Sequence, residues 1–173
     1  MRTLVLLAVG CCVAAQAVVA VAGPAATHRT IPCDEIIGIT AFPHHGSSDA
    51  RYRSRLVLGV VSAPPAHIPQ TSATQSRPWT HFSKWGMVVR AGGEPVTITV
   101  PRAWRQRVGI SWGNGGHGVF SSIRFSACGS DVTKGNAYAG GFFLRKRSGC
   151  VPLVFAAGSR RQTVWFGVGT RCN

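Results

Sequence analysis

Hydrophobic and polar residues alternate in short runs along most of the chain. In the clearest run, Val96, Ile98 and Val100 share one face of an extended segment, and two threonines occupy the other face. Turn-forming residues separate the runs, and short strands joined by frequent turns are typical of a β-sandwich. The predicted strands cover residues 35–42, 55–62, 85–91, 96–100, 108–112, 119–127, 138–145, 151–157 and 162–168. We therefore predict an all-β fold, a single antiparallel β-sandwich of about nine short strands.

The residues between and within these runs predict how the strands connect. Gly92-Gly93 and Gly158-Ser159 predict two-residue hairpin turns. Pro152 inside a run indicates a strand edge or a bulge, because proline has no N–H to donate to a sheet. Residues 63–78 are rich in Pro, Ser, Thr and Gln without an apolar period, and they predict a long mobile loop that crosses the sandwich.

Composition narrows the class of protein. The chain has 173 residues, of which 45% are apolar and 14% charged, with 21 glycines and 10 prolines. This composition excludes a wholly disordered chain and a helical bundle, and the length suits one domain. Lys and Arg number 19 against 5 Asp and Glu, a formal net charge of +14. So few acids argue against calcium sites and paired-carboxylate catalysis, whereas the positive charge favours anionic partners.

The N-terminal segment has the features of a secretory signal peptide. Arg2 precedes an apolar run that extends to Gly23, and Ala20-Val21-Ala22 fits a small-x-small cleavage site. An uncleaved membrane helix and lipoprotein processing at Cys11 are the alternatives. We predict a signal peptide over residues 1–22, a flexible leader over 23–32 and a β-sandwich domain over 33–173. The mature protein is then secreted and has no membrane span.

Four cysteines remain after the predicted signal peptide, namely Cys33, Cys128, Cys150 and Cys172. An even number in an exported domain predicts two disulfides, and the spacing contains no C-x-x-C pair that would favour zinc. A two-residue turn at Gly158-Ser159 places Cys150 opposite Gly167 and leaves Cys172 farther along the strand. This register argument predicts the pairs Cys128–Cys150 and Cys33–Cys172.

A set of glycine- and cysteine-centred motifs extends over most of the predicted domain. They are Cys33-Asp34-Glu35-Ile36-Ile37-Gly38, Gly113-Asn114-Gly115-Gly116, Ser122-Ile123-Arg124-Phe125-Ser126-Ala127-Cys128, Asn136-Ala137-Tyr138-Ala139-Gly140-Gly141-Phe142 and Cys150-Val151-Pro152-Leu153. In these motifs the chain resembles uncharacterised secreted actinobacterial proteins. The resemblance implies export and a disulfide-bearing β domain, and it carries over no activity and no catalytic residue.

Candidate catalytic groups are sparse. The segment 109–113 matches the G-x-S-x-G pattern of a hydrolase nucleophile elbow at Ser111, with His117 as a general base and Asp131 as its orienting acid. The glycines after this segment cannot begin the helix that an elbow requires. A small secreted hydrolase using Ser111 or His117 is therefore the alternative function. Adjacent histidines such as His44-His45 rarely chelate one ion, so we predict no metal site and no cofactor.

Arginine clusters and tryptophans carry the main functional prediction. Guanidinium groups bind phosphates and carboxylates bidentately, and exposed tryptophans beside arginines suit sugar stacking or cation–π contacts. We predict a non-enzymatic binding or structural module of the cell exterior that contacts an anionic cell-wall polymer, a polysaccharide or lipid headgroups. The alternative is an arginine-rich composition that only keeps the protein soluble. Nucleic acid is not expected, because no nucleic-acid-binding motif is present. The predicted binding residues are Arg102, Trp104, Arg105, Arg107, Arg145, Arg147, Arg160, Arg161 and Trp165.

Overall fold

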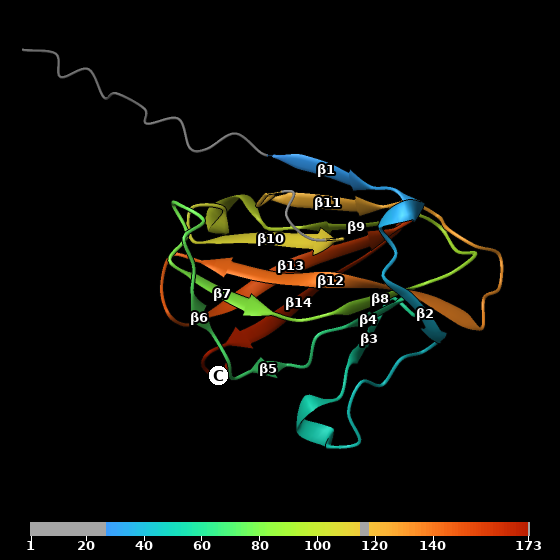
Figure 1. The fold of residues 1–173 in the computed structure, drawn as a ribbon, viewed down its shortest axis with the longest axis horizontal. Coiled ribbons are helices and arrows are strands. Elements are labelled where there is room, and N and C mark those ends of the chain that lie inside the picture. The colour runs from blue at the N-terminus through green and yellow to red at the C-terminus, as the bar shows by residue number, and fades with distance from the viewer. Residues whose placement is uncertain (1–26, 115–117, 173) are drawn as a thin grey trace, which may run out of the picture.

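The computed structural model describes residues 27–114 and 118–172, and over these residues the chain is all-β (Figure 1). Fourteen strands form two sheets, and the helical part of the described chain consists of three 3-10 turns. The predicted signal peptide, residues 1–22, lies outside the described residues.

The 3-10 turns are η1 (Cys33–Glu35), η2 (Ala50–Tyr52) and η3 (Arg102–Trp104). The strands are β1 (His28–Ile31), β2 (Gly38–Ala41), β3 (Arg55–Val57), β4 (Val61–Ala63), β5 (His67–Ile68), β6 (Ser72–Ala73), β7 (His81–Lys84), β8 (Met87–Arg90), β9 (Val96–Thr99), β10 (Val108–Gly113), β11 (Ser122–Phe125), β12 (Lys134–Leu144), β13 (Gly149–Ala157) and β14 (Arg160–Val168).

The first sheet has six strands in the order β1-β11-β9-β13-β14-β5. Its edge strands β1 and β5 run parallel to their neighbours, and the other pairs are antiparallel. β13 and β14 form a long hairpin that turns at Gly158-Ser159 as predicted, with Ala157 paired with Arg160. Gly158 has φ +54°, a left-handed conformation that glycine adopts without steric cost.

The second sheet has eight strands and is built around β12. β8 and β7 pair in succession with one edge of β12, and β2 and β10 pair in succession with the other edge. β4 and β3 extend the sheet beyond β8, while β6 extends it beyond β7. The central strand is therefore enclosed by backbone on both edges along most of its length.

The two sheets pack against each other through aromatic side chains. Phe125 of β11 lies 4.7 Å from Tyr138 of β12, and Phe142 of β12 lies 5.5 Å from Phe166 of β14, measured between ring centroids. These rings are fully buried, and Ile98 is buried with them, as the alternation along 96–100 predicts. The threonines of β9 face away from this core, which leaves the outer surface of the first sheet free for other contacts.

The predicted strand count and strand direction are wrong. The described residues hold fourteen strands rather than nine, and two pairs are parallel. One reason is that the predicted run 55–62 reverses direction at Leu58 (φ +52°) and Gly59 (φ +69°), which separates β3 from β4. A second reason is that residues 63–78 contain β5 and β6, so this segment crosses between the sheets as paired strands. Gly92-Gly93 joins β8 of the second sheet to β9 of the first sheet and is not a hairpin turn.

Residues 28–31, predicted as part of a flexible leader, form β1 (Figure 1). Their backbone pairs with Ser122–Phe125 of β11, and the side chain of Ile31 is fully buried in the core. Burial of an isoleucine contributes about 1.5–3 kcal/mol, which helps offset the entropy lost when the segment becomes ordered. The folded domain therefore begins before Cys33.

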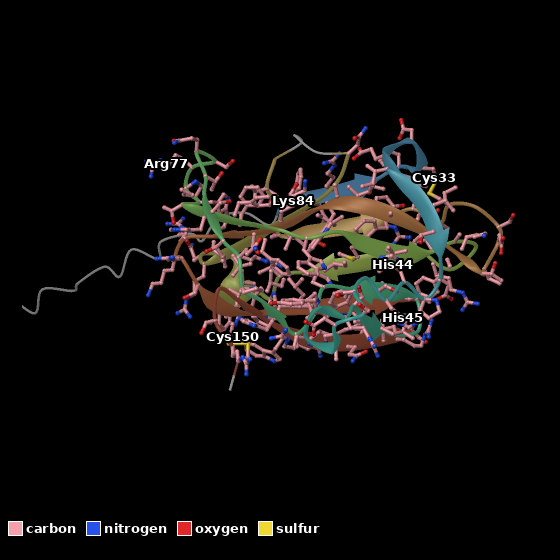
Figure 2. The ribbon with its side chains drawn as sticks, turned by 60° about the horizontal axis from the view of Figure 1, so that its bottom comes forward. Cys33, His44, His45, Arg77, Lys84 and Cys150 are labelled. Carbon is pink, nitrogen blue, oxygen red and sulfur yellow. A yellow bond between two sulfur atoms is a disulfide. The ribbon has the colours of Figure 1, made fainter. Side chains whose placement is uncertain are left out.

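Two disulfides are present, but both predicted pairs are wrong. Cys33 is bonded to Cys128 and Cys150 to Cys172, with Cα–Cα distances of 5.6 Å and 5.5 Å. The two bridges lie at opposite ends of the molecule (Figure 2). Disulfides persist in oxidising surroundings, and the two bridges are consistent with such an environment.

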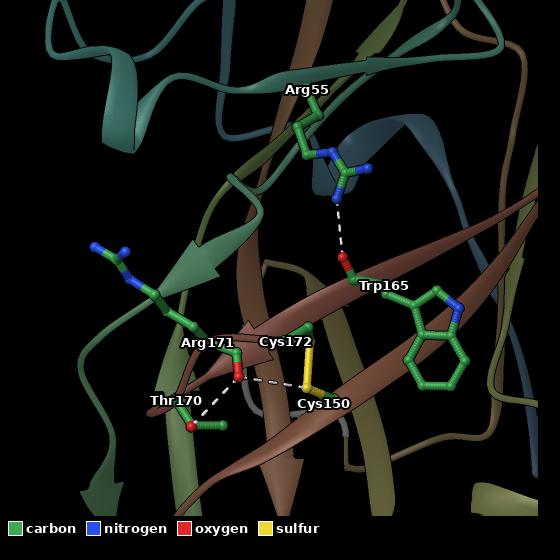
Figure 3. Close-up of a disulfide and its surroundings, with 6 residues drawn as sticks. All are labelled: Arg55, Cys150, Trp165, Thr170, Arg171 and Cys172. Atoms are coloured by element: carbon green, nitrogen blue, oxygen red, sulfur yellow. Dashed lines mark hydrogen bonds between the residues drawn. A yellow bond between two sulfur atoms is a disulfide. The ribbon is translucent and has the colours of Figure 1, made fainter.

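The predicted register is correct, and the error lies in the path of the chain after β14. Cys150 does pair with Gly167. After Val168 the chain reverses at Gly169 (φ +66°) and returns along Gly167, so that Cys172 lies beside Cys150 (Figure 3). At the other end, parallel pairing of β1 with β11 brings together Cys33 and Cys128, which come shortly after these two strands.

Tyr138 is the one buried side chain of the described residues whose polar atom lacks a hydrogen-bond partner. Its ring is packed against Phe125, and its hydroxyl is enclosed in the core. Burial, together with the negative charge of Glu35, raises the pKa of Tyr138 to about 12. The hydroxyl is therefore desolvated without compensation, which costs about 1–3 kcal/mol.

We expect Tyr138→Phe to raise the free energy of unfolding by about 1 kcal/mol at neutral pH, because it removes the unsatisfied hydroxyl. Between pH 10 and 12 the folded protein holds a proton that the unfolded chain releases, so wild-type stability falls as pH rises. The fall due to this group is at most about 1.4 kcal/mol per pH unit. Urea titrations of both proteins at pH 7 and pH 11 measure the difference. A variant less stable than wild type at both pH values would show that the hydroxyl has a partner.

Candidate functional site

Part of the outer face of the first sheet is lined by short side chains. Thr97 and Thr99 of β9 lie beside Ala156 and Val154 of β13 in the antiparallel register. These four residues form the floor of a depression with a volume of about 610 Å³. A floor without long side chains leaves room for a ligand to lie against the sheet.

Arginines stand around this floor, and the strand register explains two of them. Arg124 of β11 is paired with Thr97, and Arg161 of β14 is paired with Ala156. Both therefore belong to one row that crosses the strands. Arg124 and Arg161 are separated by three strand spacings, or about 14 Å between backbones. The two side chains flank the floor from opposite sides.

η3 supplies two more arginines at the end of β9. β9 ends at Thr99, and Pro101 is the N-cap residue of η3. Arg102 and Arg105 line the depression from this turn, and the Nε of Arg105 donates to the carbonyl oxygen of Val100 at 3.2 Å. We call the depression the arginine trough. Its lining residues are Glu94, Pro95, Thr97, Thr99, Pro101, Arg102, Arg105, Arg124, Val154, Ala156, Gly158 and Arg161.

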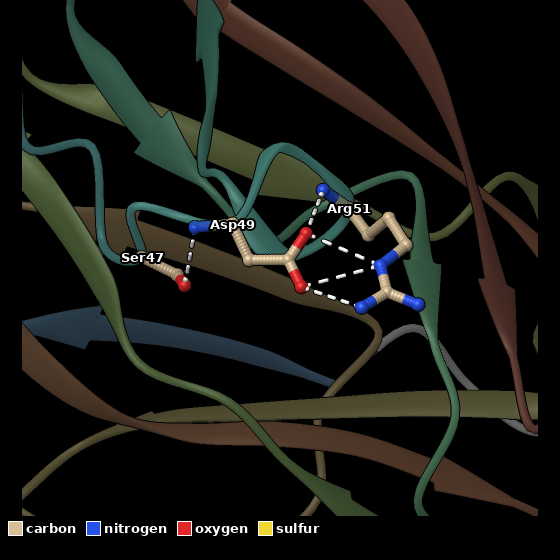
Figure 4. Close-up of polar contacts among 3 residues, drawn as sticks. All are labelled: Ser47, Asp49 and Arg51. Atoms are coloured by element: carbon tan, nitrogen blue, oxygen red, sulfur yellow. Dashed lines mark hydrogen bonds and ion pairs between the residues drawn. The ribbon is translucent and has the colours of Figure 1, made fainter.

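The charge of the arginine trough is little compensated. Glu94 is the one acid of its lining. The two ion pairs of the described residues lie elsewhere, between Arg29 and Glu35 and between Arg51 and Asp49. In the second pair, Asp49 accepts from the backbone N–H and the guanidinium of Arg51, which lowers the pKa of Asp49 below its usual range (Figure 4). Arg51 is thus balanced locally, whereas the trough has three exposed arginines and the half-buried Arg105 against one carboxylate.

A pair of tryptophans adjoins the trough. Trp104 of η3 contacts Trp165 of β14 edge to face, with 5.7 Å between ring centroids and an interplanar angle of 85°. The guanidinium of Arg107 lies 5.3 Å from the ring centroid of Trp104. Trp165 nevertheless keeps 47% of its surface exposed. The prediction that Trp165 faces outward is confirmed.

The backbone under Trp165 is held by Arg55, whose Nη1 donates to the carbonyl oxygen of Trp165 at 2.8 Å (Figure 3). Gly167, two residues farther along, donates its N–H to the carbonyl oxygen of Ala66 on the side of β14 away from β13, so the carbonyl oxygen of Trp165 also faces away from its partner Pro152. The guanidinium of Arg55 also lies 5.7 Å from the ring centroid of Phe166. Partial burial lowers the pKa of Arg55, and this arginine acts as a support for β14 rather than as a surface charge.

The remaining predicted binding residues lie outside the trough. Arg145 lines a second hollow of about 440 Å³ together with Trp104 and Arg107. Arg147 is exposed in the turn between β12 and β13. Arg160 points to the other side of β14 from Arg161 and donates to the carbonyl oxygen of Leu58 at 2.7 Å, so its role is structural. Sequence reasoning missed Arg124 as a site residue, although its position between buried Ile123 and Phe125 indicates an outward side chain.

The nucleophile-elbow pattern does not form an elbow. Ser111 lies inside β10, paired with Gly141, rather than at a turn from a strand into a helix. Asp131 accepts from the backbone and side chain of Thr133, which lowers its pKa, so its carboxylate is engaged in a local turn. His117 lies outside the described residues. Ser111 therefore lacks the geometry of the nucleophile that the hydrolase hypothesis requires.

The histidine pair, labelled in Figure 2, lies apart from the trough and the second hollow, and His44 lines a further hollow of about 400 Å³ with Tyr52 and Trp85. The Nδ1 of His44 is 3.4 Å from the hydroxyl of Thr40, and the backbone N–H of His44 donates to Ser62. Over residues 27–114 and 118–172, no group of three or more His, Cys, Asp or Glu side chains is placed to hold a metal ion.

No protein-family model matches the chain, and no curated protein is significantly similar to it in sequence. The resemblance to secreted actinobacterial proteins therefore stays a prediction. In the part of the chain that the structure describes, there is no helix with the length and apolar character needed to span a bilayer. A functional assignment has to rest on the trough and the residues around it.

Proposed function

We propose that this protein is an exported, non-enzymatic binding module whose arginine trough holds an anionic polysaccharide of the cell exterior. The observation that carries the proposal is the grouping of Arg102, Arg105, Arg124 and Arg161 around a floor of short side chains with one acid nearby. Guanidinium groups pair bidentately with carboxylate, sulfate or phosphate groups, and the threonine hydroxyls of the floor add donors and acceptors.

The spacing of the arginines favours a polymer over a small anion. Arg124 and Arg161 are about 14 Å apart at the backbone and flank the floor from opposite sides, while Arg102 and Arg105 line it from η3, so the positive charge is spread around the trough. A chain with repeated negative charges engages several of the four arginines at once. Because their exposed pairs are worth about 0.2–1 kcal/mol each, useful affinity depends on such multiple contacts.

Export is part of the proposal. Two disulfides suit an oxidising compartment, and the apolar N-terminal run with Ala20-Val21-Ala22 suits a cleaved signal peptide. Outside the cell the abundant polyanions are wall polymers, acidic polysaccharides and lipid headgroups. A trough formed on the face of a rigid sheet suits an extended chain lying along it.

The test replaces three trough arginines together, as Arg102→Gln, Arg105→Gln and Arg161→Gln. We expect the affinity for polygalacturonate, an acidic polysaccharide, to fall by about ten- to a hundredfold, since each lost pair is worth up to about 1 kcal/mol. Binding of wild type should also weaken steeply with salt, because the screening length falls from about 10 Å at 0.1 M to about 3 Å at 1 M. Calorimetric titration measures both effects.

The matched control is Arg53→Gln, Arg77→Gln and Lys84→Gln, which lowers the net charge by the same three units. These side chains are exposed and lie away from the trough, with Lys84 at the end of β7 of the second sheet and Arg77 in the segment before β7 (Figure 2). The control variant should bind like wild type. Equal weakening by both triple variants would show that only overall charge matters. Preference for anionic vesicles over the polysaccharide would move the ligand to a membrane surface.

A further inference from the structure

We propose that Trp165, braced by Trp104, stacks on a sugar ring of the same chain whose anionic groups occupy the arginine trough. The inference rests on the proposed function and makes it more specific. It distinguishes a polysaccharide that carries acidic groups from a polyanion that has only charge. The recognition site then has two parts, an electrostatic part and a flat apolar part.

The two parts are continuous on the surface. η3 contributes to both of them, because Arg102 and Arg105 line the trough while Trp104 contacts Trp165. Along β14, Arg161 and Trp165 are four residues apart and face the same side of the sheet, a separation of about 14 Å. Thr163 lies between them on that face. A single extended polysaccharide chain lying along β14 therefore reaches both Arg161 and Trp165.

Trp165 is exposed and held in place at the same time. Almost half of its surface faces solvent, although a tryptophan of a β-sheet usually buries its ring. The edge contact with Trp104 restrains the indole, and the bond from Arg55 to its carbonyl oxygen restrains the backbone. A rigid aromatic side chain loses little conformational entropy on binding, so it gives affinity efficiently.

The flat apolar face of the Trp165 indole favours a sugar as the ligand. A pyranose ring has a face of C–H groups that packs on an indole, and an acidic sugar adds a carboxylate at the ring edge for a neighbouring arginine. Polyphosphate has no such apolar face. Single-stranded nucleic acid stacks its bases on several successive aromatic platforms, whereas this surface offers one exposed indole beside the trough.

The experiment measures dissociation constants of the disulfide-bonded protein for polygalacturonate, for polyphosphate and for single-stranded DNA. Trp165→Ala should weaken binding of polygalacturonate about tenfold, the size of a stacking contact, and change binding of polyphosphate less than twofold. Trp165→Phe, which keeps an aromatic ring, should retain most of the affinity. Leu56→Ala is the control, because it removes another exposed apolar side chain, on β3 of the second sheet.

The outcomes separate this inference from the proposed function. One outcome is that the triple arginine variant no longer binds polygalacturonate while Trp165→Ala binds it like wild type. The tryptophan then has no part in recognition, so this inference fails while the proposed function stands. Equal weakening for polygalacturonate and polyphosphate would show a disturbed trough rather than stacking, and would also overturn it. Tighter binding of DNA than of polygalacturonate, lost in Trp165→Ala, would assign the surface to nucleic acid. Absence of polyanion binding by wild type would overturn both proposals.

Discussion

Replacement of both Cys33 and Cys128 by alanine is expected to lower the free energy of unfolding by about 5 kcal/mol. The bridge closes a segment of 95 residues, which the chain-entropy relation converts to about 4.7 kcal/mol of stabilisation. Loss of the bridge also frees β1 at its C-terminal end, where Ile31 is buried in the core. Urea unfolding followed by tryptophan fluorescence measures the change.

The double variant Cys150→Ala and Cys172→Ala serves as the comparison. It opens a loop of 22 residues, for which the same relation gives about 3 kcal/mol. A greater loss at Cys150–Cys172 than at Cys33–Cys128 would contradict this account. Peptide mapping without reduction should recover the two observed pairs.

Gly140→Ala is expected to cost about 3–5 kcal/mol or to prevent folding. β12 is enclosed by β10 on one edge and by β7 and β8 on the other. A Cβ at Gly140 would overlap the carbonyl oxygen of Ser111 and lie 2.7 Å from the Cα of Trp112. Backbone atoms of a central sheet cannot shift without breaking their own hydrogen bonds, and overpacking of this kind is strongly destabilising.

Gly149→Ala is the matched control for this substitution. Gly149 also lies in a strand, β13, but a Cβ there would meet no atom within 4 Å. We expect its stability to stay within about 0.5 kcal/mol of wild type. Thermal unfolding of the two variants under identical conditions makes the comparison. If Gly140→Ala unfolds at the wild-type temperature, β10 and β12 are not packed as closely as described.

The alternation of apolar and polar residues predicted the local structure well, because it depends only on the two-residue repeat of side-chain direction within one strand. The buried and exposed faces of β9 and the pairing of Cys150 with Gly167 were both predicted in this way. Pro152, for which the sequence predicted a strand edge or a bulge, lies at a local edge of β13. The ladder between β13 and β9 covers Val154–Ala157, so Pro152 lies beyond its end, where no N–H is required.

The candidate site was predictable in part. Adjacent residues of a strand face opposite sides, so Arg160 and Arg161 had to separate, and the structure assigns only Arg161 to the trough. Arg124 was missed because its neighbours come from strands distant in sequence. Its place beside Thr97 depends on the pairing of β11 with β9, which no local pattern specifies.

The all-β class, the outward face of each clear strand, the number of disulfides and the excess of positive charge can all be read from the sequence. Which cysteines pair, that residues 28–31 belong to the fold, and which arginines meet became known only from the folded chain. Side-chain alternation is a property of one strand, whereas pairing depends on where chain reversals bring strands together. The reversal at Gly169, which returns Cys172 to Cys150, costs almost nothing locally and changes the whole disulfide pattern.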